Sequence, residues 1–169
     1  MKVLVVSDIH DDIDRLGRIL ADTHGTAEAV VFCGDLSAPF TAALLAESGK
    51  PVYAVFGNCD EDQAFIIHRS QGKIEWTPIG QEFAVLKLGG RTIAVNHYPK
   101  LAELLAKTGE YDASFHGHTH EARNELVDGK TLLLNPGAVC GIQRGKRGTA
   151  SYALYDTETN TAQIVPLNP

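Results

Sequence analysis

The first half of the chain alternates continuous apolar runs with segments of helical periodicity. The apolar runs, rich in β-branched residues, are 2–6, 29–33 and 52–56. Apolar residues recur at helical spacing over 13–20, where Asp11 and Asp12 can cap the helix, and residues 41–47 predict a second helix. Continuous apolar strands separated by helices indicate a parallel sheet that is covered on both faces.

The second half shows hairpin signals instead. Its predicted strand pairs are 83–88 with 91–95, 122–127 with 130–134, and 151–156 with 162–167. Gly89-Gly90 and Asp128-Gly129 join the first two pairs, as expected of two-residue hairpin turns. This half of the chain therefore favours antiparallel pairing, in contrast to the first half.

One predicted helix interrupts these hairpins. Leu101, Leu104 and Leu105 lie on one face of it, and Glu103 and Lys107 form an i,i+4 pair. The whole pattern predicts an α/β fold in which two mixed β-sheets pack together with helices outside. No linker, repeat or low-complexity segment divides the 169 residues, so we expect a single domain over residues 1–169.

Composition and charge narrow the class of protein. The chain is 44% hydrophobic and 21% charged, and its net charge is -6. Such an acidic chain gains little from attraction to a phosphate backbone, so we expect no general nucleic-acid binding. No apolar run approaches the roughly 20 residues of a membrane span, and the first run is too short for a signal peptide. We therefore expect a cytoplasmic protein without membrane contact.

Potential metal ligands follow five of the apolar runs. They are Asp8 and His10 after 2–6, Asp35 after 29–33, Asn58 after 52–56, His97 after 91–95, and His118 and His120 after 112–115. The carboxyl edge of such a sheet is where ligands bind. In a strand-end D-x-H, side-chain alternation lets Asp8 and His10 face the same way and share one ion.

The types of these residues select the metal. A mixed set of oxygen and nitrogen ligands suits Mn, Fe, Ni, Zn or Co better than all-oxygen Ca or Mg. Seven ligands are too many for one tetrahedral ion, but they fit two ions that share a bridging carboxylate. We therefore expect two divalent transition-metal ions as cofactors, manganese first, with Ni, Fe, Zn or Co as alternatives.

These motifs, taken together and in order, resemble a known family. The set D-x-H, G-D, G-N-x-D, a lone His after a strand, and G-H-x-H is similar to that of the calcineurin-like metallophosphoesterases. The short length and the sequence GNCD most resemble their small bacterial and archaeal phosphodiesterase branch. The resemblance runs from Asp8 to Gly137, where NPG also matches. It implies a four-layer αββα sandwich and a metal-dependent phosphodiesterase.

The resemblance also implies roles for single residues. It places Asp8, His10, Asp35 and His120 around the first ion, and Asn58, His97 and His118 around the second, with Asp35 as the bridge. Two divalent ions would lower the pKa of a bridging water, and the resulting hydroxide would attack phosphorus in line. Asn58, His97 and His118 are accordingly the expected catalytic residues, and Asn58 stabilises charge on the phosphoryl oxygens.

The chain departs from the family pattern at two places. Many larger members carry a His at the position of Cys59, and that His serves as an acid or a phosphate ligand. A neutral thiol replaces it poorly. Tyr98 follows the metal-binding His97 where the family usually has Gly. Asp60 is expected either to orient a neighbouring ligand or to cap the next helix. His116 is expected either to contact the ligands or substrate or to be structural.

Three functions fit this pattern. The first is a dinuclear phosphoesterase acting on a small phosphodiester. The second is a protein-interaction scaffold, because the retromer subunit with this fold works chiefly through protein contacts. The third is a metal-binding module without turnover. The complete ligand set favours catalysis, and the substrate and the oligomeric state, including a homo-oligomer, stay open.

Overall fold

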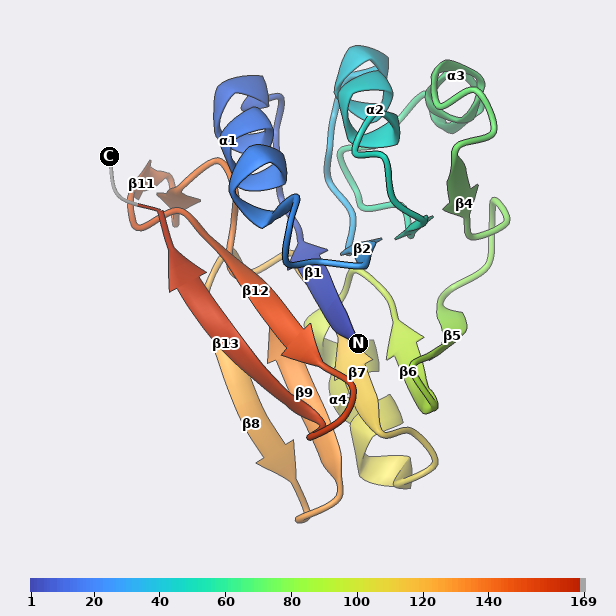
Figure 1. Ribbon diagram of the computed structural model, residues 1–169, viewed down its shortest axis with the longest axis vertical. Helices are drawn as coiled ribbons and strands as arrows, with labels where there is room; N and C mark the ends of the chain where they lie inside the picture. Colours follow the sequence, from blue (N-terminus) through green and yellow to red (C-terminus); the bar gives the residue numbers. More distant parts are fainter. Residues whose placement is uncertain (168–169) are drawn as a thin grey trace.

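The computed structural model describes residues 1–167, which form two β-sheets with helices on their outer sides (Figure 1). The six-stranded sheet has the order β13-β12-β1-β2-β3-β4 and the five-stranded sheet the order β5-β6-β7-β9-β8. A two-stranded ribbon, β10-β11, stands apart from both. This arrangement confirms the predicted mixed α/β fold with two packed sheets.

The strands agree closely with the apolar runs. The six-stranded sheet contains β1 (Lys2–Val6), β2 (Ala29–Phe32), β3 (Val52–Ala54), β4 (Ile74–Trp76), β12 (Ser151–Asp156) and β13 (Thr161–Pro166). The five-stranded sheet contains β5 (Ala84–Leu88), β6 (Arg91–Val95), β7 (Ala113–Phe115), β8 (Arg123–Val127) and β9 (Thr131–Asn135). The ribbon is β10 (Ile142–Gln143) and β11 (Lys146–Arg147), and neither it nor β4 was predicted from the sequence.

The central strands are apolar at every position because both of their faces are covered. In β1, Leu4 and Val6 pack against the helices, while Val3 and Val5 face the second sheet. The pairs β1–β2, β2–β3 and β3–β4 are parallel, which follows from the helices that connect successive strands. The layer between the sheets includes Phe115, whose ring meets the Tyr155 ring edge-on.

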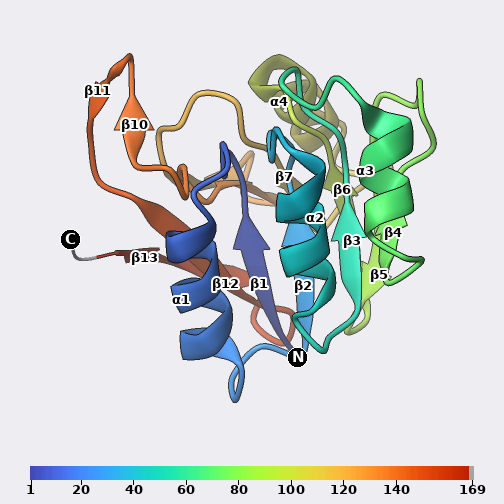
Figure 2. The same cartoon turned by 90° about the horizontal axis from the view of Figure 1, so that it is seen from above.

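Three helices cover the six-stranded sheet and one covers the other. They are α1 (Ile13–Thr23), α2 (Pro39–Ala46), α3 (Gln63–Arg69) and α4 (Pro99–Thr108). Figure 2 shows α1, α2 and α3 next to one another on one face of the six-stranded sheet. Asp12 caps α1 by accepting from the Arg15 N–H, whereas Asp11 accepts from the Ala38 N–H and the Thr41 hydroxyl at the start of α2. Within residues 1–167, no helix combines the length and apolar character that crossing a membrane requires.

The side chains of α4 differ from the expectation in two respects. Leu104 is 54% exposed, and the buried face of the helix is formed by Ala102, Leu105 and Ala106. Glu103 pairs with Arg123 of β8 across the sheet edge, at 2.5 Å between the charged atoms. The i,i+4 pattern alone does not reveal this partner, because Arg123 is distant in the sequence.

Candidate metal centre

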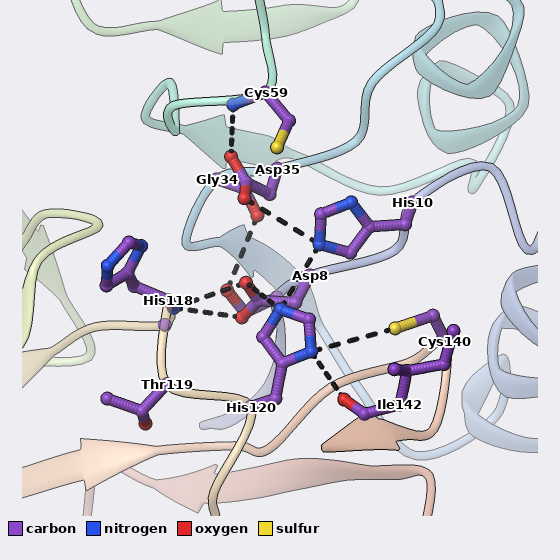
Figure 3. Close-up of polar contacts among 12 residues, drawn as sticks. Asp8, His10, Gly34, Asp35, Cys59, His118, Thr119, His120, Cys140 and Ile142 are labelled. Atoms are coloured by element: carbon purple, nitrogen blue, oxygen red, sulfur yellow. Dashed lines mark hydrogen bonds and ion pairs between the residues drawn. The ribbon is translucent and has the colours of Figure 1, made fainter. Parts of the chain in front are cut away.

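The seven predicted ligands lie at one edge of the molecule, where the two sheets end together. Asp8, Asp35 and Asn58 follow the carboxyl ends of three neighbouring parallel strands, β1, β2 and β3. His97 follows β6 of the second sheet, and the loop after β7 carries His118 and His120. Figure 3 shows several of these side chains converging on the space between the loops.

One cluster of atoms surrounds the expected first metal position. The Nε2 atom of His120 lies 3.2 Å from Asp8 Oδ1 and 3.2 Å from His10 Nε2. Ligand atoms held about 2.0–2.2 Å from one ion stand roughly 3 Å apart. The Nε2 atom of His120 is therefore spaced from Asp8 and from His10 as two ligands of one ion are.

A second cluster lies beside the first. The Oδ1 atom of Asn58 is 2.8 Å from His118 Nδ1 and 3.2 Å from His97 Nε2. The Nδ1 atom of His97 lies 2.7 Å from the Cys33 carbonyl oxygen, to which it donates a hydrogen bond when Nε2 is the ligand. This contact leaves the Nε2 lone pair of His97 free for a metal.

Asp35 lies between the two clusters. Its Oδ2 atom is 3.7 Å from His10 Nε2 and 3.5 Å from His97 Nε2, so one carboxylate oxygen faces a histidine of each cluster. Its other oxygen accepts the Cys59 N–H at 2.8 Å, which fixes the orientation of the group. This geometry suits a carboxylate that two cations share.

In the protein without metal, histidines partner both carboxylates. Hydrogen bonding to Asp8 raises the pKa of His120 to about 10. Burial alone would raise the pKa of Asp35, but hydrogen bonds from His97 and the Cys59 N–H outweigh it and lower the pKa to about 2. Each carboxylate is therefore paired with an imidazole when no metal is bound.

The backbone at the ligands is unusual. Five of the predicted ligands have positive φ: Asp8 (53°), His10 (45°), Asp35 (64°), His118 (70°) and His120 (60°). Strand β1 ends at Val6, so Asp8 and His10 are not alternating strand residues as the D-x-H pattern suggests. Left-handed turns, rather than the period of a strand, bring their side chains together. Such conformations gather at functional sites, where the surrounding structure holds them.

Two glycines permit the close approach of these loops. A Cβ atom at Gly57 would lie 2.1 Å from Asp35 Oδ1, and one at Gly117 would lie 1.9 Å from Ser7 Oγ. Neither position tolerates a side chain, because such contacts are far shorter than van der Waals distances. Their role is to let one ligand loop touch the next.

Asp60 holds two of the ligand loops. Its Oδ2 atom accepts from the N–H groups of Asp35 at 2.9 Å and Gly57 at 2.8 Å. Its Oδ1 atom accepts from Leu36 at 2.8 Å and Ser37 at 3.0 Å. The side chain is buried, and the cap of α3 is instead Asp62. Of the two expected roles, the structure therefore shows Asp60 orienting a ligand loop.

Three further candidates have different surroundings. The Tyr98 ring is partly exposed and lies 5.2 Å from the rings of both His97 and His118, at the border of the second cluster. Burial and the nearby Asp35 raise the pKa of the Cys59 thiol to about 11. His116 is 1% exposed, and its Nδ1 atom lies 3.0 Å from the Gly117 carbonyl oxygen. It therefore packs under the loop that carries His118 and His120, away from solvent.

Cys140 lies beside the candidate ligands, although no sequence motif predicts it there. Its Sγ atom lies 3.9 Å from His120 Nδ1, and the ligand atoms of His10, His120 and Cys140 all lie within 4.8 Å of one another. No motif predicts this contact, because Cys140 comes after the last motif that matches the family. It lies in the loop just before β10, which the sequence did not predict either. Next to it, a groove of about 820 Å³ runs from His10 and Ile13 to Arg147.

Comparisons with known proteins show the family and agree with the fold. The profile of the calcineurin-like phosphoesterase superfamily domain matches residues 1–160. Phosphodiesterase MJ0936 of Methanocaldococcus jannaschii is 28% identical over 163 residues, which cover 94% of each chain. The solved structure of an archaeal phosphodiesterase superposes with a TM-score of 0.87 at 24% identity, over 99% of this chain and 100% of that one. The structure of wild-type Vps29 of Entamoeba histolytica in complex with Zn²⁺ superposes with a TM-score of 0.67 at 20% identity, over 99% of this chain and 100% of Vps29.

Proposed function

Because the chain belongs to the calcineurin-like phosphoesterase superfamily and is a hydrolase, we propose that it is a dinuclear metal-dependent phosphodiesterase. The observation that carries this proposal is Asp35, one carboxylate oxygen of which lies within 3.7 Å of a histidine from each ligand cluster. A scaffold has no need for a shared carboxylate between two complete ligand sets. The match to a curated phosphodiesterase supports diesters as the substrate class.

The residues present fit two transition-metal ions. Asp8, His10 and His120 would hold the first, and Asn58, His97 and His118 the second, with Asp35 shared between them. Mixed oxygen and imidazole donors fit manganese, with Ni, Fe, Zn or Co as alternatives. Such ions, when bound, neutralise the phosphoryl oxygens and acidify a water that serves as the nucleophile.

The remaining residues prepare the site for this chemistry. The Cys33 carbonyl fixes the tautomer of His97, and the Ile142 carbonyl, 2.5 Å from His120 Nδ1, fixes that of His120. Both rings then keep the Nε2 lone pair directed into the centre. The groove that begins at His10 is open to solvent and leaves room for the second ester group of a small diester. We propose a cytoplasmic single-domain enzyme without nucleic-acid partners.

Manganese is expected to raise the melting temperature, and the increase is expected to grow with pH. The pKa of His120 is raised from 6.5 to about 10, so its ion pair with Asp8 stabilises the metal-free protein below pH 6.5. That contribution to stability is lost as the pH rises from 6.5 to about 10. Over the same range manganese binds more tightly, because fewer ligands carry a proton that the metal must displace. The measurement is thermal unfolding with manganese or chelator across this range. Identical melting curves with and without chelator would contradict preformed metal sites.

Turnover is expected to depend steeply on the leaving group. At neutral pH the Cys59 thiol, with a pKa of about 11, holds its proton and donates it poorly. Without a general acid, the rate of hydrolysis falls roughly 10²–10⁴-fold for substrates with poor leaving groups. We therefore expect fast hydrolysis of nitrophenyl diesters by the manganese-loaded protein and a sharp loss with alkyl leaving groups. Cys59→His should raise the hydrolysis rate of diesters with alkyl leaving groups and leave that of nitrophenyl diesters almost unchanged.

The test is a plot of log rate against leaving-group pKa for a series of diesters. Tyr98→Phe asks whether the partly exposed phenol next to His97 supplies the proton, in which case the plot becomes steeper. His116→Gln is the control, because this buried side chain does not reach solvent. A flat plot for the wild type would contradict the idea that the enzyme lacks a general acid. If no diester is hydrolysed at all, the proposed function is wrong.

A further inference from the structure

We propose that His10, His120 and Cys140 form a separate inhibitory site for a thiophilic divalent ion such as Zn²⁺ or Cd²⁺. The proposal rests on the phosphodiesterase centre described above, because the site borrows two of its ligands. The three ligand atoms lie within 4.8 Å of one another, a separation that a small movement of side chains closes around one ion. Two imidazoles and a thiolate form a set that suits a soft or borderline ion.

The sulfur of the proposed site lies on the other side of the His120 ring from Asp8, and His10 is shared with the dinuclear centre. Nε2 of His120 faces Asp8 and His10, whereas Nδ1 faces the sulfur of Cys140, 3.9 Å away, and the Ile142 carbonyl oxygen. Figure 3 shows Cys140 and Ile142 together on this side of the ring. An ion that binds Nδ1 therefore meets the Cys140 thiol and the Ile142 carbonyl oxygen, which the dinuclear centre does not use, and it takes His10 and His120 from that centre.

Two features of the surrounding structure support a site rather than an accidental contact. The backbone of Cys140 is held on both sides, since its N–H donates to the Asp8 carbonyl at 3.2 Å and its carbonyl accepts from Arg15 Nη1 at 3.0 Å. The groove of about 820 Å³ is lined by His10 and Cys140, which gives an ion a path from solvent. The backbone that carries the sulfur is thus fixed, and the residue borders a groove that is open to solvent.

Binding at this site excludes binding at the first catalytic position. A neutral imidazole has one lone pair, so His120 cannot ligate one ion through Nδ1 and another through Nε2. An ion on Nδ1 moves the ring proton to Nε2, where it points at Asp8 and closes the first position. The Cys140 thiol proton is released to the buffer. The thiophilic ion therefore inhibits without occupying the position of the catalytic ion.

The experiment adds Cd²⁺ to the manganese-loaded protein and records the ultraviolet sulfur-to-cadmium charge-transfer absorption together with diesterase activity. For the wild type we expect the absorption to appear in step with inhibition. In Cys140→Ser the absorption should vanish, and the Cd²⁺ concentration for half inhibition should rise by at least the roughly tenfold that loss of a metal contact causes. Cys140→Ala is the second variant, in case serine perturbs the loop.

Two control variants separate this site from the other thiols. Cys33→Ala removes a thiol buried between the sheets, and Cys59→Ser removes the thiol beside Asp35. Both should keep the absorption. Its persistence in Cys140→Ser and Cys140→Ala, or its loss in Cys59→Ser instead, would overturn the proposal. Because the absorption is read without turnover, it tests the site even if the protein hydrolyses no diester.

Discussion

Replacing Asp35 with Asn is expected to remove both metal ions and the diesterase activity with them. One oxygen of this carboxylate faces His10 at 3.7 Å and His97 at 3.5 Å, so the group belongs to both clusters. Burial opposes ionisation, but the contacts with His97 and the Cys59 N–H outweigh it and keep the group ionised, with a pKa of about 2, whereas an amide carries no charge to offset two cations. The activity should fall by more than the roughly 10²–10³-fold that loss of one stabilising group costs.

Metal content after dialysis against metal-free buffer is the measurement, by mass spectrometry of the protein. Asp14→Asn makes the same change of charge at an exposed position in the first turn of α1 and should leave both content and activity unaltered. An Asp35→Asn protein that retains two equivalents of manganese would show that another group joins the ions.

Replacing Asp60 with Ala is expected to give the largest loss of stability. The substitution removes the acceptor of four N–H groups, those of Asp35, Leu36, Ser37 and Gly57. Each buried donor left without a partner costs about 1–3 kcal/mol, and water can reach only some of them. We expect the free energy of unfolding to fall by about 3–5 kcal/mol.

Urea unfolding of the metal-free protein measures this loss, and Asp62→Ala is the matched control in the same loop. Asp62 is exposed and accepts one hydrogen bond, from the Phe65 N–H, so its loss should cost only about 1 kcal/mol. Manganese should also bind less tightly to Asp60→Ala, because the loops of Asp35 and Gly57 lose their common support. Equal losses for the two variants would contradict the role of Asp60.

The apolar runs predict most of the fold because covered strands and amphipathic helices leave a local periodicity. The ribbon β10-β11 escapes prediction because its strands have only two residues each, and β4 escapes because Glu75 interrupts its apolar residues. The exposure of Leu104 also escapes, since its helix buries alanines more fully than this leucine. Such details depend on the packing partner rather than on the period of the segment itself.

The meeting of the candidate ligands is predictable because the loops that carry them follow strands whose carboxyl ends lie at one edge of the molecule. What the sequence does not reveal is how the loops are held. The left-handed turns at Asp8 and His10 replace the expected alternation. The four contacts of Asp60 and the position of Cys140 beside His120 depend on loops that meet only in three dimensions.

The central claim is that two metal ions share Asp35 at the meeting edge of the two sheets. The most direct test is a crystal structure of the manganese-loaded protein, with anomalous difference maps recorded at the manganese absorption edge. The account predicts two peaks, one beside Asp8, His10 and His120 and one beside Asn58, His97 and His118, with the Asp35 carboxylate touching both. A single peak, or two peaks that Asp35 does not join, would contradict it.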